Sequence, residues 1–196
     1  WEWLLAARSQ YPTLVPIRDQ SCSLKYSPRP IARGRNVGIA AATSEIVACA
    51  DAGCPYRPHW LARLTAPIIT GTAQYSLGGS CIDPAAPTLW DIASAPFFGI
   101  KLDPNEPTKS CTARSMAFRK ELWQRVGGFP ETVLLGEDTL FDARVRKTVT
   151  PAFAARAKAF YHPRHTLKSA LHQLASYAIA DGTLGIRPAR LFRNLA

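Results

Sequence analysis

The sequence contains no run of about 18 apolar residues, so it predicts no helix that crosses a membrane. It also lacks, near its start, a basic stretch followed by an apolar one, which is the pattern of a secretory signal. Charged residues make up only 19% of the 196 residues and apolar residues 47%, which excludes a disordered chain and predicts one globular domain.

Paired cysteine motifs are absent as well. The five cysteines are an odd number and include no CxxC pair, which argues against a disulfide scaffold and against a structural zinc site. This cysteine usage favours a reduced environment and therefore predicts a cytoplasmic location.

Acidic residues are few: 14 Asp and Glu stand against 24 Lys and Arg, which gives a net charge of +10. A field of this sign favours anionic partners such as nucleic acid, anionic lipid or a phosphorylated substrate. The alternative interpretation is that the net charge only keeps the protein soluble. The basic residues form no run of five and no aromatic-interleaved motif. The sequence therefore predicts no nucleic-acid partner.

Apolar periodicity and breaker residues predict alternating strands and helices. Strands are expected at 13–18, 45–50, 72–77, 111–118 and 157–161, and helices at 1–8, 33–42, 59–69, 89–95, 120–126, 137–147 and 166–180. This order indicates an α/β domain with a mostly parallel sheet flanked by helices. Residues 78–110 are rich in Gly and Pro and predict a mobile functional segment beside a cleft. We assign residues 1–182 to the domain and 183–196 to a basic tail.

Four polar motifs are candidates for chemistry. Asp51 follows the apolar strand at 45–50, where a carboxylate is well placed to hold a cation on a diphosphate, although it can also cap the following turn. Glu137 and Asp138 begin a predicted helix, where acids are favoured by the helix dipole; Asp138 can act as a base if it faces a cleft. His162 follows a predicted strand and is either a ligand for metal or phosphate or a polar loop residue.

The fourth motif lies on the helix predicted at 166–180. Gln173, Tyr177 and Asp181 are spaced i, i+4 and i+8 and therefore share one helix face. Such a face can line a cleft or be the solvated side of the helix.

Three long runs, in order, resemble motifs of one enzyme family. The run ARGRNVGIAAATSEIVACADAGCPYRPHWLARL resembles the "aRNxGixxAxGexixxxDADCxxxxxWLxxL" segment of family-2 glycosyltransferases. The runs TARSMAFRKELWQRVGGFPETVLLGEDTLFDARVRK and HQLASYAIADG resemble two later segments of the same family. The resemblance covers residues 32–182.

The resemblance implies a GT-A-like (Rossmann-like) fold and a metal-assisted, inverting transfer of a sugar from a nucleotide-diphosphate donor to a glycan, lipid or other hydroxyl acceptor. It matches Asp138 to the catalytic base and Glu137 to its neighbour. The residues matched to donor binding are Arg35, Asn36, Asp51, Gln173 and Tyr177, and those matched to a divalent cation, Mg²⁺ or Mn²⁺, are Asp51 and His162.

The sequence also departs from the family pattern. Gly53 stands where many members have a second Asp, and the family's opening strand and nucleobase-binding acid are missing. We therefore expect an N-terminally truncated transferase domain; the alternative is a non-catalytic relative or fragment that binds an anionic glycan or nucleotide or scaffolds a partner. The tail is expected to form a basic amphipathic helix on an anionic membrane surface, at the cytoplasmic face, or to pack on the domain.

Overall fold

The computed structural model describes residues 15–18, 22, 30–83, 87–103, 105, 107–109 and 111–185. The helix predicted at 1–8 and residues 186–196 of the basic tail lie outside this part of the chain. Of the strand predicted at 13–18, only residues 15–18 are described, and they have no regular secondary structure. No helix in the described ranges has both the length and the apolar character needed to span a bilayer.

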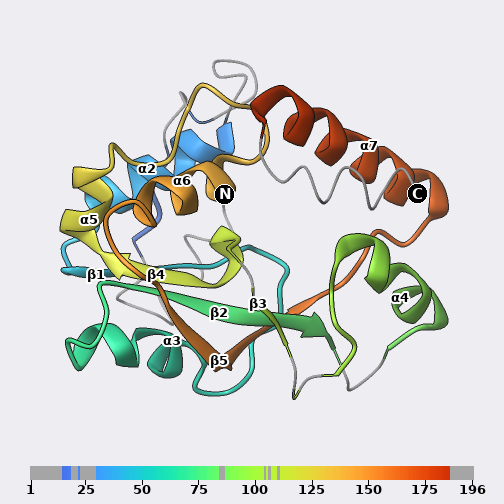
Figure 1. The fold of residues 1–196 in the computed structure, drawn as a ribbon, viewed down its shortest axis with the longest axis horizontal. Helices are drawn as coiled ribbons and strands as arrows, with labels where there is room; N and C mark the ends of the chain where they lie inside the picture. Colours follow the sequence, from blue (N-terminus) through green and yellow to red (C-terminus); the bar gives the residue numbers. More distant parts are fainter. Residues whose placement is uncertain are drawn as a thin grey trace.

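The described chain forms an α/β unit built on one mixed sheet (Figure 1). Its strands are β1 (Ile46–Cys49), β2 (Tyr75–Ile82), β3 (Thr108–Lys109), β4 (Met116–Arg119) and β5 (Ala152–Tyr161). The strand order is β1-β4-β2-β3, and β5 pairs with β2. The α/β class is therefore confirmed.

The prediction of a mostly parallel sheet was wrong for the described strands. Only β2 and β5 pair in parallel, whereas β1 with β4, β4 with β2, and β2 with β3 are antiparallel. The strand β1 pairs with β4 alone, so in this part of the chain it lies at the edge of the sheet and not inside it. An apolar run favours a strand whichever way its neighbours run, because strand direction is set by pairing with distant segments.

Helices cover both faces of the sheet. The helices α2 (Pro30–Ala41), α5 (Lys120–Arg125) and α6 (Glu137–Val145) lie on one face, and α3 (Trp60–Ile69) lies on the other (Figure 1). The helices α4 (Leu89–Ser94) and α7 (Leu167–Leu184) lie toward the end of the sheet where β2 and β5 finish. The domain boundary predicted after residue 182 thus falls inside α7.

Side-chain alternation on the strands produces two separate cores. Phe118 packs with Phe141 and Phe129 in the core beneath α2, α5 and α6. Its neighbour Ala117 points the opposite way and packs with Leu64 of α3. The small residue on that face lets α3 approach the sheet closely.

The predicted strands differ in their bounds from those observed. Residues 113–115 of the strand predicted at 111–118 form a 3-10 turn, so β4 begins only at Met116. The strand predicted at 157–161 begins five residues earlier, at Ala152. Part of the segment 78–110 is regular as well, since β2 continues to Ile82 and α4 forms where a short helix was predicted.

The centre of β2 tolerates no side chain at Gly78. A Cβ atom there would lie 2.0 Å from Ser115 Oγ and 2.5 Å from the carbonyl oxygen of Ala157. We expect Gly78→Ala to lower the free energy of unfolding by about 2–3 kcal/mol, because either β2 or the turn that contains Ser115 must shift to relieve the overlap. Gly38 in α2 is the matched control: a Cβ atom added there would meet no described atom within 4 Å, so Gly38→Ala should stabilise by about 0.5–1 kcal/mol. Urea denaturation measures the free energy of unfolding of both variants. Equal changes in the two variants would contradict the predicted overlap at Gly78.

Candidate functional site

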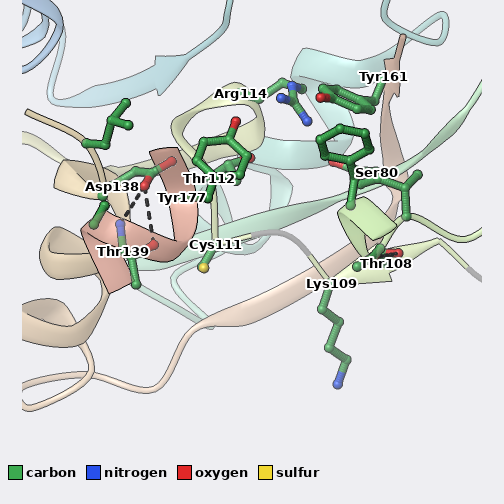
Figure 2. Close-up of a pocket in the computed structure, with 16 residues that line it drawn as sticks. Ser80, Thr108, Lys109, Cys111, Thr112, Arg114, Asp138, Thr139, Tyr161 and Tyr177 are labelled. Atoms are coloured by element: carbon green, nitrogen blue, oxygen red, sulfur yellow. Dashed lines mark hydrogen bonds between the residues drawn. The ribbon is translucent and has the colours of Figure 1, made fainter. Parts of the chain in front are cut away.

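A pocket of about 610 Å³ lies at the carboxyl ends of β2 and β5 (Figure 2). Its volume is in the range of small-ligand sites, and strand ends are where α/β sheets usually bind ligands. The wall combines a carboxylate, two cations, aromatic rings and hydroxyl groups. Its lining residues are Ser80, Phe98, Gly99, Ile100, Thr108, Lys109, Cys111, Thr112, Arg114, Leu135, Gly136, Asp138, Thr139, Tyr161, Tyr177 and Ala180.

Asp138 lies in this wall at the first turn of α6. The chain enters the helix through Gly136, whose φ of 85° is in the left-handed region that favours glycine. One carboxylate oxygen of Asp138 accepts a hydrogen bond from the backbone N–H of Thr139 at 2.7 Å, and the other faces the N–H of Ala113 at 3.4 Å. Among the described residues Asp138 forms no ion pair, so its carboxylate is available to a ligand in the pocket.

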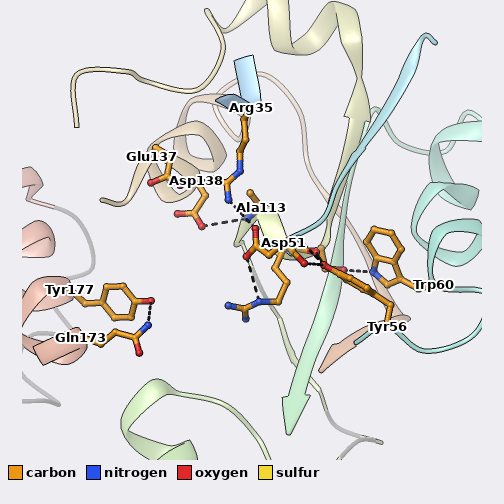
Figure 3. A network of polar contacts seen from close by, with 11 residues as sticks. Arg35, Asp51, Tyr56, Trp60, Ala113, Glu137, Asp138, Gln173 and Tyr177 are labelled. Carbon is orange, nitrogen blue, oxygen red and sulfur yellow. Dashed lines mark hydrogen bonds and ion pairs between the residues drawn. The ribbon is translucent and has the colours of Figure 1, made fainter. Parts of the chain in front are cut away.

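Glu137 points away from the pocket into the protein. Its side chain is only 8% exposed and pairs with the guanidinium of Arg35, which also donates to Asp51 Oδ1 at 3.0 Å (Figure 3). Burial lowers the pKa of Arg35, but the carboxylates of Glu137, Asp51 and Asp138 outweigh burial and raise it above its ordinary value. Burial and the nearby Asp138 raise the pKa of Glu137. Arg35 thus joins α2, the end of β1 and the start of α6.

Asp51 and Arg114 are held together by one tyrosine. The Tyr56 hydroxyl accepts from the backbone N–H of Asp51 at 2.8 Å and lies 3.2 Å from the carbonyl oxygens of both Asp51 and Arg114. The Tyr56 ring packs on Trp60, which donates to Ser115 Oγ at 2.8 Å. Burial raises the pKa of Tyr56 to about 12, so the phenol stays protonated and can donate near neutral pH. These contacts fix the loop after β1 against the turn before β4.

The two predicted metal ligands, Asp51 and His162, have different partners in the described part of the chain. Arg35 binds one carboxylate oxygen of Asp51, and Arg114 Nε lies 3.7 Å from the other. His162 is exposed and lies close enough to Asp91 of α4 to affect its pKa. Burial raises the pKa of Asp91, but hydrogen bonds from Thr88 and the charges of His162 and His165 outweigh burial and lower that pKa below its ordinary value. No three His, Cys, Asp or Glu side chains in the described ranges gather as a metal-binding cluster. These residues do not fit the divalent cation that the family resemblance implies.

The polar face predicted on α7 is observed in part. Gln173 donates to the Tyr177 hydroxyl at 2.8 Å, and Tyr177 lines the pocket. Both lie close to Tyr161 at the end of β5, where burial, with a smaller contribution from Tyr177, raises the pKa of the phenol to about 12. Asp181, the third residue of this face, is buried at 3% exposure. The helix therefore contributes Tyr177 and Ala180 to the pocket, and Gln173 holds the Tyr177 hydroxyl.

The side-chain amide of Asn36 makes all of its hydrogen bonds within the protein. Its amide nitrogen donates to the carbonyl of Phe129 and to Glu131, both at 2.8 Å. Its amide oxygen accepts from the N–H of Phe129 at 2.9 Å and from the indole of Trp123 at 3.2 Å. An amide has two donor hydrogens and two acceptor positions, so none remains for a nucleotide. These bonds join α2, next to Arg35, to Trp123 and to the segment that contains Phe129 and Glu131.

We expect Asn36→Asp to lower the free energy of unfolding by about 2–4 kcal/mol. A carboxylate cannot donate, and it would face the Phe129 carbonyl and the Glu131 carboxylate that the amide now binds. Arg33→Gln is the control, because it removes an ion pair of 3.5 Å to Glu131 between two exposed side chains and should cost less than about 1 kcal/mol. Urea denaturation measures both; a loss for Asn36→Asp no larger than for the control would refute the assignment.

Sequence reasoning missed most of the pocket wall, including Arg114 and Tyr161. The Arg114 guanidinium lies over the Tyr161 ring, 4.5 Å from its centroid, and its side chain is 14% exposed. Both residues are within predicted strands and within runs that the sequence analysis considered, but neither was predicted to bind a ligand. The sequence offered a signal for Tyr161, which ends a predicted strand, and none of this kind for Arg114, which lies inside one.

Comparison with protein-family models gives no match, and no curated protein matches the chain significantly.

Proposed function

We propose that this chain is a glycosyltransferase that uses a nucleotide-diphosphate sugar as donor and a hydroxyl compound as acceptor. The observation that supports it best is the composition of the pocket wall: Asp138, with no ion pair in the described part of the chain, shares the wall with Arg114 and with the rings of Tyr161 and Tyr177. The resemblance of three long runs to family-2 glycosyltransferases supports the same reaction.

Each group in the wall has a chemical counterpart in the substrates. A guanidinium suits a phosphate, because its planar N–H groups match phosphate oxygens in geometry and charge. Aromatic rings offer flat apolar faces that a sugar or a base can cover. Ser80, Thr108 and Thr112 add hydroxyl groups of the kind that orient a ligand by hydrogen bonding.

In the proposed reaction Asp138 acts as the general base. Its carboxylate takes the proton from the acceptor hydroxyl as the acceptor oxygen attacks the anomeric carbon. The new carbon–oxygen bond forms while the bond to the diphosphate breaks, and the diphosphate leaves with the bonding electron pair. A single displacement of this kind inverts the configuration at the anomeric carbon. Arg114, in the same wall, provides positive charge for the leaving diphosphate.

The experiment is a turnover assay with the purified chain and a panel of UDP-, GDP- and TDP-sugars. Release of nucleoside diphosphate is followed with and without a mixture of glycan and lipid acceptors. Acceptor-dependent release above the rate of hydrolysis supports the proposal. Binding of a nucleotide-sugar without release would instead favour the non-catalytic relative, and neither binding nor release would refute both.

A further inference from the structure

The pocket contains a cationic side chain whose role the predicted site did not include. Arg114 is 14% exposed, lines the pocket, and has its guanidinium over the Tyr161 ring. Its Nε is buried and has no hydrogen-bond partner among the described residues, since Asp51 Oδ2 at 3.7 Å is within ion-pair distance but beyond hydrogen-bond distance. The Nε group faces Asp51, and the guanidinium has further N–H groups that can donate to a ligand oxygen in the pocket that Arg114 lines.

The surroundings of Asp51 favour an arginine-based anion site over a metal centre. A divalent cation in proteins takes several oxygen ligands. Asp51 offers two oxygens, and each faces a guanidinium group, from Arg35 at 3.0 Å and from Arg114 at 3.7 Å. A third positive charge at this position would be repelled by both arginines. Asp51 therefore acts as a counter-ion that orients Arg114 toward the pocket.

We infer that Arg114 binds the diphosphate of the nucleotide donor and neutralises it without a divalent cation. Asp51 and Tyr56 position the arginine, and the Tyr161 ring supports its guanidinium face. This inference rests on the proposed function and adds to it a named diphosphate-binding residue. It also replaces the predicted metal centre at Asp51 and His162.

Calorimetric binding of UDP, GDP and ADP tests the inference without any need for turnover. For whichever nucleotide binds, we expect the same Kd within about twofold in excess EDTA and in millimolar MnCl₂. Arg114→Gln should raise that Kd about 10- to 100-fold, because a charge-assisted, bidentate contact is lost. Arg114→Lys should fall between Arg114→Gln and the unsubstituted chain, since it keeps the charge but not the planar fork.

Two further variants separate this inference from its alternatives. Asp51→Asn should keep the Kd of the diphosphate in EDTA within a few-fold, because its amide oxygen can still hold one arginine and one competing negative charge is gone; loss of a metal ligand would instead abolish binding. Arg125→Gln is the matched control, as Arg125 is half exposed, outside the pocket, and its loss removes the same charge. Thermal denaturation of each variant confirms that it is folded under the assay conditions.

The outcomes are distinct. Binding that requires Mn²⁺ and is abolished by Asp51→Asn would overturn the arginine site while leaving the proposed function standing. Equal weakening by Arg114→Gln and Arg125→Gln would also overturn it, because only net charge would then matter. Absence of binding of any nucleotide, with or without Mn²⁺, would remove the proposed function and this inference together.

Discussion

Asp138→Asn is expected to lower kcat for sugar transfer by a factor of about 10²–10⁴. Asparagine has the size of aspartate but cannot accept the proton of the acceptor hydroxyl. Its amide oxygen can keep the 2.7 Å hydrogen bond from the N–H of Thr139, and only the long 3.4 Å contact to Ala113 is lost. Stability should therefore change little while turnover falls. Initial rates at saturating donor and acceptor measure the effect.

Asp142→Asn is the matched control for this variant. It makes the same chemical change one turn later on α6, outside the pocket, at a carboxylate that binds the Tyr75 hydroxyl at 2.9 Å and Arg146 at 2.7 Å. Asp142→Asn should lower the free energy of unfolding but leave kcat within a few-fold of the unsubstituted chain at temperatures where the variant is folded. If both variants reduced kcat equally, Asp138 would have no special role in catalysis.

Of all these variants, Arg35→Met should lower the free energy of unfolding most, by about 3–5 kcal/mol. Arg35 is 19% exposed and neutralises both Glu137, which is 8% exposed, and Asp51. Methionine fills a similar volume but leaves a buried carboxylate without its partner, and the desolvation cost of Glu137 is no longer offset. Urea denaturation near neutral pH measures the loss.

The destabilisation of Arg35→Met should depend on pH. Burial and Asp138 already raise the pKa of Glu137, and the opposing charge of Arg35 is absent in the variant, so that pKa rises further. The pKa of Glu137 in the folded variant therefore lies above its pKa in the unfolded chain. The free energy of unfolding falls as the pH rises from the unfolded-state pKa to the folded-state pKa, and it recovers as the pH falls below the unfolded-state pKa. The deficit relative to the unsubstituted chain should therefore be largest at neutral pH and shrink in mild acid.

A double-mutant cycle tests the cause directly. Glu137→Gln in the Arg35→Met background removes the unpaired charge and should restore about 1–2 kcal/mol. Additive losses in the double variant would show that the two side chains do not interact, contrary to the contact between them.

The sequence by itself determined the α/β class and most of the elements. Five of the seven predicted helices, including those that became α3, α5 and α6, fall within two residues of their observed starts, because capping and breaker residues act over a few positions. It also located Asp138 at a helix start and Gln173 and Tyr177 on one face of α7, since both follow from helical periodicity. Local patterns were sufficient where the deciding interactions are local.

Only the tertiary structure decided the strand directions, the edge position of β1 and the members of the pocket. Pairing of β4 with β1 and β2 depends on residues about 40 to 70 positions apart, which no local pattern records. The same holds for Asn36, whose partners lie more than 80 residues away, and for Arg114, which acquires its role from Asp51 and Tyr161. The sequence specifies which side chains carry charge. Whether that charge is paired, buried or directed toward a pocket depends on the groups that folding brings around it.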